Sequence, residues 1–485
     1  LQELHAKPGY WRSSNTTTVF QSCSKAHYGN DAATIGQERC CPTGLCGNAT
    51  DLTSTDVQCL AGYSGPLCMV CSPTHVLKGK QCEPCPGGPD LPAAIGAFAG
   101  IIGFLFLVMV LVVCKTKSYD DDKDADQMNI KDHVADQATI LISWAQVISA
   151  VTVTFNSVAW PDNFATASNG VGLVNLDVGL LFPYASCRLS LPFGWKFGFH
   201  LMTPVAVVVS VKLATFVAVK LTRGRASANS TALVHQREAQ QAIGHNIMLT
   251  GLLLLYPSLT TTIFTSLRCY KVEGVGLMLE RDFSIECWSN EHNLFVVVAI
   301  VSMVAYMVGI PCYLFYDLWV HREHLHNINS DNYHAIRFKM GSFFKAYEPS
   351  YWYFECIVMG QKMLLAGAMS VIAPRSPLQL LIGFLVCIVY VLVVLKTAPY
   401  EEDSLDVLSF LSSLAVAFTL LGGLIKRLDG TDQGFGEGFN RTLGHVLIGM
   451  NCIPMGYALY DLGRKVWWRR KRTGMGGEVG EMGGV

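Results

Sequence analysis

The chain has 485 residues, of which 51% are hydrophobic and 15% are charged, and its mean hydropathy is +0.33. Because soluble domains carry about 25% charged residues, this composition is typical of a membrane protein. The formal net charge of -1 provides no basic field, so nucleic-acid binding is excluded from the expected functions.

The first 90 residues differ from the rest of the chain in their cysteine content. They hold nine of the 17 cysteines: Cys23, Cys40, Cys41, Cys46, Cys59, Cys68, Cys71, Cys82 and Cys85. This density indicates a disulfide scaffold in an oxidising compartment. N-glycosylation sequons at Asn15 and Asn48 point to the same compartment. We therefore predict a small extracellular domain over residues 1–90 that is held together by bridges.

The cysteine spacing after residue 58 resembles the loops of EGF-like or ephrin-receptor-like modules. Cys59 precedes the pair Cys68-x-x-Cys71, and Cys82-x-x-Cys85 follows. The two Cys-x-x-Cys pairs also have the spacing of zinc ligands, which leaves a zinc site open as an alternative. We expect disulfides here, and neither a metal nor a cofactor.

Residues 91–466 contain nine apolar segments that are long enough to cross a bilayer as helices. They lie at about 92–114, 138–160, 197–221, 245–267, 293–319, 353–373, 378–397, 405–426 and 442–465. The stretch 161–187 is also apolar, but it carries Asn175 and Asp177, so we interpret it as an interfacial or re-entrant outer segment. The predicted fold is an all-α polytopic membrane protein with a small disulfide-rich N-terminal domain.

The distribution of Lys and Arg predicts how the helices are oriented. Lys and Arg gather after the odd-numbered segments, which places those loops and the C-terminus in the cytoplasm and the N-terminus outside. The outer loops then receive Cys187, Cys269, Cys287 and the sequon at Asn440. We expect a plasma or ciliary membrane location.

The number of outer cysteines predicts how they pair. Nine in the N-terminal domain and three in the loops are both odd numbers, whereas their sum is even. We predict that Cys269 pairs with Cys287 and that Cys187 bridges to the N-terminal domain. A free Cys187 or an intermolecular bridge is the alternative.

Polar side chains within the predicted crossings are the candidate site residues, because such groups are costly in lipid and usually face the interior of a bundle. Gln146, Ser149 and Asn156 follow one face of the second segment. Lys212 lies in the third segment, and Glu355 and Lys362 lie in the sixth. These residues are candidates to line an ion path, and interhelical hydrogen bonding is the alternative use.

The C-terminal tail, residues 467–485, begins with a basic cluster and continues with glycines. The cluster consists of Trp467, Trp468, Arg469, Arg470, Lys471 and Arg472. Interfacial aromatics beside cations predict binding to anionic lipid, and a plain topology anchor is the alternative.

Several stretches resemble a multi-pass family of algae and other protists that is grouped with transient-receptor-potential-like, fungal polycystin and flavin-carrier membrane proteins. They are residues 141–149 with Trp160 and Pro161, residues 174–177 before Cys187, residues 256–258, Asp282 followed by Cys287 and His292, residues 309–311, residues 351–355 with Lys362, and residues 377–379 leading to residues 398–400. The resemblance implies a cysteine-rich ectodomain on about nine helices and, by analogy, cation conduction or surface sensing.

The linker between the last two predicted crossings bears on where ions would pass. Residues 426–441 are too few for a pore helix, a filter and a glycan. We therefore expect any conduction path to run within the bundle of one subunit.

The predicted function is a transient-receptor-potential-like cation channel or related transporter with a sensing ectodomain. The alternative is a noncatalytic surface receptor or anchor whose residues 1–90 bind an extracellular protein or glycan. Hydrolase, nucleotide-binding and metalloprotease motifs are missing from the sequence, so we do not expect an enzyme. The lipid bilayer is the expected partner, and a homo-oligomer is possible.

Overall fold

The structure is a computed structural model, and it describes part of the chain. The described residues are 6–14, 17–23, 32–41, 55–78, 81–85, 91–115, 125–155, 157–171, 192–224, 231–330, 332–428 and 437–480.

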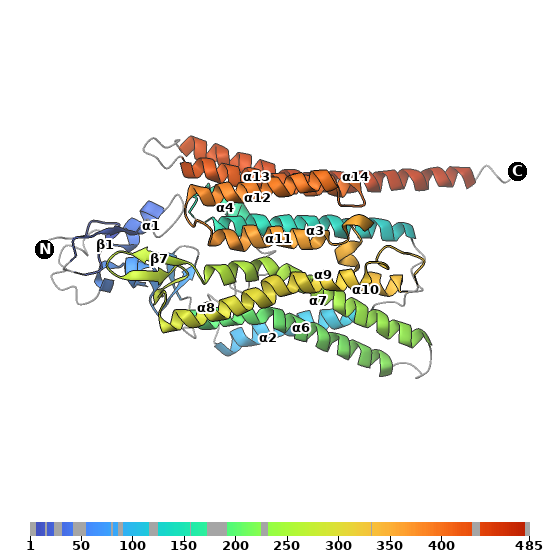
Figure 1. Ribbon diagram of the computed structural model, residues 1–485, viewed down its shortest axis with the longest axis horizontal. Helices are drawn as coiled ribbons and strands as arrows, with labels where there is room; N and C mark the ends of the chain where they lie inside the picture. The colour runs from blue at the N-terminus through green and yellow to red at the C-terminus, as the bar shows by residue number, and fades with distance from the viewer. Residues whose placement is uncertain are drawn as a thin grey trace.

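All nine predicted apolar segments form helices, which run along the long axis of the molecule (Figure 1). The long helices are α2 (Leu91–Cys114), α3 (Ala125–Thr154), α6 (Phe193–Gly224), α7 (Thr231–Thr265), α8 (Asn290–Ser302) continued by η7 (Met303–Val308) and α9 (Gly309–His321), α11 (Phe354–Lys362) continued by η9 (Met363–Gly367) and η10 (Ala368–Ser370), α12 (Pro377–Thr397), α13 (Asp403–Leu428) and α14 (Glu437–Gly480). Local signals mark some of the boundaries. Ser376 caps α12 by accepting from the Gln379 amide, and Pro377 occupies the first turn, where no N–H is needed.

Six of these helical stretches, among the described residues, are long and apolar enough to cross a membrane. They are Ile130–Thr154, Phe193–Thr222, Val234–Thr265, Asn290–His321, Pro377–Thr397 and Asp403–Leu428. The chain is therefore a helical multi-pass membrane protein by length and composition. The helices α2, α11 with its continuation, and α14 were also predicted to cross, and these three crossings stay predictions.

The helices form two groups that pack side by side. One group centres on α3, α12, α13 and α14, whose core includes Val151, Phe155 and Leu420. The other centres on α6, α7 and the α8–α9 helix, whose core includes Leu249 and Leu314. The α11 segment and η9 contact helices of both groups. The cysteine-rich strands, such as β1 and β7, and the last turns of α14 lie at opposite ends of the molecule (Figure 1).

The cysteine-rich region, defined here as the described part of residues 6–85, is built from short hairpins. Its strands are β1 (Tyr10–Trp11), β2 (Gln21–Ser22), β3 (Tyr63–Ser64), β4 (Val70–Cys71), β5 (His75–Lys78) and β6 (Gln81–Pro84), beside helix α1 (Ala32–Arg39) and the short turns η2 (Thr55–Gln58) and η3 (Pro66–Cys68). The bridges with both cysteines among the described residues are Cys23–Cys40, Cys59–Cys68 and Cys71–Cys82, and Cys41 and Cys85 are disulfide-bonded as well. Cys68 and Cys71 are thus consumed by bridges, which removes the zinc alternative.

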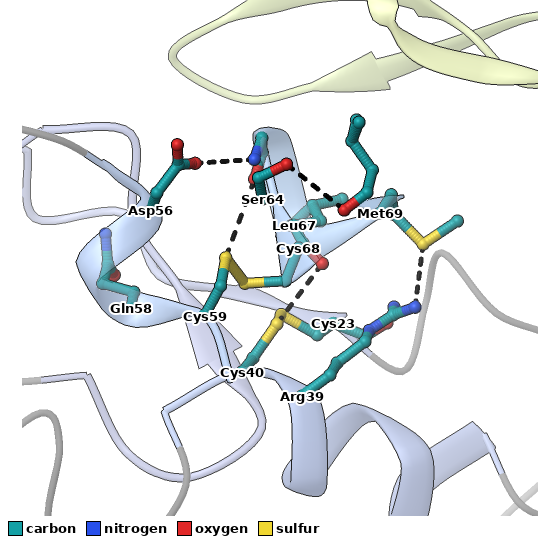
Figure 2. The surroundings of a disulfide bond; sticks show 12 residues. Cys23, Arg39, Cys40, Asp56, Gln58, Cys59, Ser64, Leu67, Cys68 and Met69 are labelled. Atoms are coloured by element: carbon teal, nitrogen blue, oxygen red, sulfur yellow. Dashed lines mark hydrogen bonds between the residues drawn. A yellow bond between two sulfur atoms is a disulfide. The ribbon is translucent and has the colours of Figure 1, made fainter. Parts of the chain in front are cut away.

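A buried arginine stabilises the region between its first two bridges (Figure 2). The Arg39 guanidinium donates to the Cys23 carbonyl and lies 2.9 Å from the Met69 sulfur. Burial lowers the pKa of Arg39 to about 10. Such a small domain has little apolar core of its own, so bridges and a buried donor take over part of the constraint.

A three-stranded sheet between α7 and α8 completes the core of the cysteine-rich region. Its strands are β7 (Cys269–Val272), β8 (Gly276–Leu279) and β9 (Asp282–Glu286), and a Cys269–Cys287 disulfide closes it. Val272, Met278 and Phe283 pack in one cluster with Trp11, Cys23, Cys40, Cys59, Leu67 and Cys68. The sequence did not predict this sheet, because part of its burial comes from a segment more than 180 residues earlier, while Leu279 and Ile285 pack against the flanking helices.

Other elements also differ from the prediction. Helix α3 begins at Ala125, before the predicted residue 138, and ends at Thr154. Helix α10 (Tyr333–Phe344) was not predicted, because it is amphipathic and short. Helix α4 (Asp162–Val171) has ten residues, which is too short for a crossing. Helix α14 runs on to Gly480, so the backbone does not break at the predicted tail boundary at residue 467.

We predict that Phe283→Ala lowers the stability of the cysteine-rich region by about 3–5 kcal/mol, because it opens a cavity in the shared core. Limited proteolysis of the detergent-purified chain should then cleave within residues 1–85 faster than in the parent. Phe216→Ala is the control, because Phe216 is 64% exposed on α6. Equal cleavage rates in the two variants would contradict a shared core.

We also predict a bridge between Cys187 and the cysteine-rich region. Cys187 and Cys46 lie outside the described residues, whereas Cys41 and Cys85 are disulfide-bonded and Cys114, Cys312, Cys356, Cys387 and Cys452 are free. Mass spectrometry of nonreduced peptides should find Cys187 joined to a peptide from residues 1–90. A free Cys187 thiol would contradict the prediction.

Candidate intramembrane site

Gln146 joins three helices inside the bundle. Its side chain, on α3, is fully buried, and its Nε2 donates to the Leu254 carbonyl of α7 at 2.9 Å. Pro257 lies in the same part of α7 and supplies no backbone N–H, so the Leu253 carbonyl four residues before it lacks its helical donor. Gln146 Oε1 accepts a hydrogen bond of 3.1 Å from the Lys362 ammonium of α11. Gln146 thus satisfies a carbonyl and a charge at once.

A π-helical segment begins directly after Lys362. In η9 the Ala366 carbonyl accepts from Thr154 at 2.9 Å and from Thr261 at 3.0 Å, so hydroxyls of α3 and α7 replace helical hydrogen bonds. The second π segment, η7, is bound in the same manner, because the Tyr256 hydroxyl donates to the Met307 carbonyl. Because π segments recur at functional sites, these two segments beside α7 make the surrounding part of the bundle a candidate site.

A cavity of about 50 Å³ extends from Lys362 toward the end of the bundle that carries α10. Its polar lining consists of Asp136, Thr139, Ser143, Ser342, Tyr347, Glu355, Gln361, Lys362, Tyr390, Tyr400, Ser409, Ser412 and Ser413. Thr139 and Ser342 are exposed at the rim, whereas Glu355, Lys362 and Ser412 are buried at the floor. The cavity therefore reaches from solvent into the apolar bundle.

Glu355 holds the buried negative charge of the cavity. It is 3% exposed, and its Oε2 accepts a 2.8 Å hydrogen bond from the Tyr347 hydroxyl. Burial, and then the Glu355 charge, raise the pKa of Tyr347 well above its ordinary value, so Tyr347 remains a donor. Burial and the same carboxylate also raise the pKa of Tyr400.

Three residues that line the cavity carry a buried polar atom with no hydrogen-bond partner among the described residues. They are Trp144 Nε1 on α3, Glu355 Oε1 on α11 and Ser412 Oγ on α13, and the last two are oxygen atoms. Leaving buried polar atoms unpaired costs free energy, and the cost is larger for a charged group. These two oxygen atoms are therefore suited to a small polar ligand between α11 and α13.

Apolar side chains close the far end of the cavity. Val147 and Val416 line the cavity, and both belong to the buried apolar cluster that includes Val151, Phe155 and Leu420. The site is consequently open toward one end of the bundle and closed toward the cysteine-rich end.

The structure brings together three of the six candidate path residues: Gln146, Glu355 and Lys362. Ser149 is buried on α3 but does not line the cavity. Asn156 lies outside the described residues, and α3 ends before it, at Thr154. Lys212 is exposed on the outer surface of α6 and is not part of the site. The sequence could not show this, because the apolar pattern of a helix does not reveal which face its neighbours cover.

Sequence reasoning missed the polar stripes of α3 and α13. Asp136, Thr139 and Ser143 recur at intervals of three and four, and Ser412 and Ser413 lie three and four residues after Ser409, so each set lies on one helical face. That signal was available. Tyr347 and Tyr400 were not recognisable, because they lie outside the crossings and reach the site only through the fold.

Ion pairs fix α10 at the mouth of the cavity. Asp317 of α9 binds Lys339 at 2.7 Å and His245 at 3.0 Å. Asp132 of α3 pairs with Arg337 and Lys345. Helix α10 is thereby tied to both helix groups.

A second cavity, of about 610 Å³, lies at the cysteine-rich end. Its lining comes from β1 and β2, from the β7–β9 sheet and from the loop before α12, and includes Tyr10, Phe20, Tyr270 and Arg375. Arg375 lies 4.1 Å from the centre of the Tyr270 ring, and Glu280 binds Arg375 at 3.1 Å. Its size is within the range of small-molecule sites.

Three residues near this end are close enough to bind a metal ion, but two of them form a disulfide. The three are Cys269, Cys287 and His292, and the disulfide joins the two sulfurs. They are thus not available as thiolate ligands.

The remaining predicted surface sites are only partly described. Asn15 and Asn48 lie outside the described residues, whereas Asn440 lies in the first turns of α14 and accepts from Lys426. Trp467 and Trp468 are exposed on α14, and Arg469 is half-buried. The side chains of Arg470, Lys471 and Arg472 lie outside the described part.

Comparison with known proteins gives one distant likeness. Over 170 residues, 33% of the chain, it is 25% identical to cysteine repeat modular protein A of Toxoplasma gondii. The match covers 5% of that protein, so the chain corresponds to a small share of this relative. The relative's name fits the disulfide-bonded N-terminal region. No known family profile and no solved structure match the chain.

We predict that Gln146→Leu lowers stability by about 3 kcal/mol, because it leaves the Lys362 ammonium and the Leu254 carbonyl unpaired. The double variant Gln146→Leu/Lys362→Met should recover part of that loss, since the uncompensated charge is gone. Thermal unfolding in detergent measures both, with Lys212→Met as the control on an exposed lysine. If the stability losses of the two single variants simply add in the double variant, the proposed coupling between Gln146 and Lys362 is wrong.

Proposed function

We propose that the chain moves cations across a bilayer, as a transient-receptor-potential-like channel or related transporter with a sensing ectodomain. The supporting observation is the buried cavity that holds Glu355 and Lys362. Ionisable groups at such depth are rare and usually serve ion or substrate pathways. The path belongs to one subunit, because α3, α11 and α13 of a single chain surround it.

The closed apolar end of the cavity supports a gated path. Val147 and Val416 separate the polar lining from the cysteine-rich end. The π segments and Pro257 supply backbone that is less constrained by helical hydrogen bonds. Opening then requires the helices around Gln146 to move apart.

The proposed topology has nine crossings, with the N-terminus outside and the C-terminus in the cytoplasm of a plasma or ciliary membrane. The nine helical segments and the opposite positions of the cysteine-rich strands and the last turns of α14 support it (Figure 1). In this orientation the cavity opens to the cytoplasm, and α14 brings Trp467 and Trp468 to anionic inner-leaflet lipid.

The second candidate is a noncatalytic surface receptor or anchor. It is favoured by the 610 Å³ cavity and by the core that the cysteine-rich region shares with the β7–β9 sheet. An extracellular protein or glycan bound in that cavity would contact the sheet that follows α7. This role requires no passage of ions through the bundle.

Flux measurements separate the two candidates. We predict that proteoliposomes containing the 485-residue chain take up monovalent cations, and that Lys362→Met and Glu355→Gln each lower the initial rate at least about tenfold. Lys212→Met should leave the rate unchanged, because Lys212 lies on the lipid-facing surface. Variants are compared at equal reconstituted amounts of folded protein. Cation uptake no faster than in protein-free vesicles would contradict the transport proposal and favour the noncatalytic receptor or anchor.

A further inference from the structure

The two buried charges of the cavity lie on one face of α11. Glu355 and Lys362 are seven residues apart, which is about two turns and about 10 Å along the helix. The carboxylate acts electrostatically on the ammonium. When both are ionised their charges cancel, and the floor of the site is neutral.

Within the described part of the chain, five other titratable groups face this pair. They are Asp136 of α3, Tyr347 before α11, Cys356 on α11 itself, Tyr390 of α12 and Tyr400 before α13. The tyrosines lie in a tightly packed, buried cluster and stay neutral. Asp136 lies nearer the rim, where Lys345 opposes its charge. The ionic balance at the floor therefore depends on Glu355 and Lys362.

The unpaired atoms and the space between them define a ligand site. Glu355 Oε1 and Ser412 Oγ are both buried, both lack a partner among the described residues, and both face the same cavity. A volume of 50 Å³ holds about three to five water molecules, at about 10–15 Å³ each. Carboxylate and hydroxyl oxygens are ligands for hard cations.

We infer that this site binds one alkali cation between Glu355 and Ser412 and that the cation exchanges with the proton of Lys362. As the cation reaches the Glu355 carboxylate, the Lys362 ammonium releases one proton and becomes a neutral amine that still bonds Gln146. One positive charge enters and one leaves, so the buried site keeps its net charge.

The charge balance favours exchange over simple binding. A cation added to the neutral pair would leave an uncompensated positive charge in an apolar environment, which is strongly unfavourable. Release of the Lys362 proton removes that charge, and lysines lose protons readily when buried. The inference rests on the proposed function and specifies it further: the transported ion is an alkali cation, and the ion exchanged for it is a proton.

Linkage predicts a distinctive pH dependence. If one cation displaces one proton, the apparent cation affinity rises about tenfold per pH unit while Lys362 is protonated in the cation-free state. Each binding event releases about one proton per chain. A site that binds only water shows neither effect.

The experiment uses the full chain in detergent. Sodium or potassium chloride is added in weakly buffered solution containing a pH dye, with choline chloride as the inert salt, and binding of radioactive sodium is measured at two pH values one unit apart. The parent should acidify the solution with the alkali salts and show the pH-dependent affinity. Circular dichroism and size-exclusion profiles verify that each variant is folded.

The variants separate the roles of the two charges. Glu355→Gln should lose both binding and proton release, and Ser412→Ala should weaken binding while retaining the proton coupling, which keeps the test usable if Glu355→Gln does not fold. Lys362→Met should still bind sodium, but with an affinity that no longer changes with pH. Lys212→Met should behave as the parent.

The outcomes distinguish this inference from the proposed function. Cation uptake by vesicles without proton release, or a pH-independent affinity in the parent, overturns the exchange and leaves transport standing. Loss of uptake overturns transport itself. A pH-dependent affinity that persists in Lys362→Met also overturns the exchange, because it assigns the proton to another group.

Discussion

The hydrogen bond from Lys362 to Gln146 is the constraint on which the centre of the bundle depends. An ammonium group in an apolar environment is tolerable only where fixed dipoles replace water. Gln146 provides one such dipole and donates its own amide to Leu254, so a single side chain satisfies α7 and α11 at once. Because these partners come from both helix groups, their separation exposes an unpaired charge and an unpaired carbonyl together.

Helix α7 connects this centre to the outer structure. It carries Leu254 and Pro257 at mid-bundle, Thr261 against the π segment η9, and ends at Thr265, three residues before β7. The sheet that begins there contributes Val272, Met278 and Phe283 to the core of the cysteine-rich region. A displacement of that region on the bundle therefore acts on the same helix that Gln146 holds. Sensing outside and a charge-bearing cavity inside are thus compatible parts of one architecture.

The positions of the helices were largely readable from the sequence, whereas the faces they bury were not. Lys212 and Lys362 both lie within apolar segments, and hydropathy treats them alike. The fold exposes the first on α6 and buries the second beside Gln146. The β7–β9 sheet and α10 were not predicted for a related reason, since part of their burial comes from partners that are remote in the chain.

The sequence alone determined that the chain is a helical membrane protein with a disulfide-bonded N-terminal region, because the length of an apolar run and the density of cysteines are local properties. Only the tertiary structure decided which polar residues share a cavity. Ser143, Glu355 and Ser412 line the cavity from three different helices, and their meeting depends on how each helix is rotated against its neighbours. Helix rotation follows from side-chain packing across the whole bundle, which no local pattern encodes.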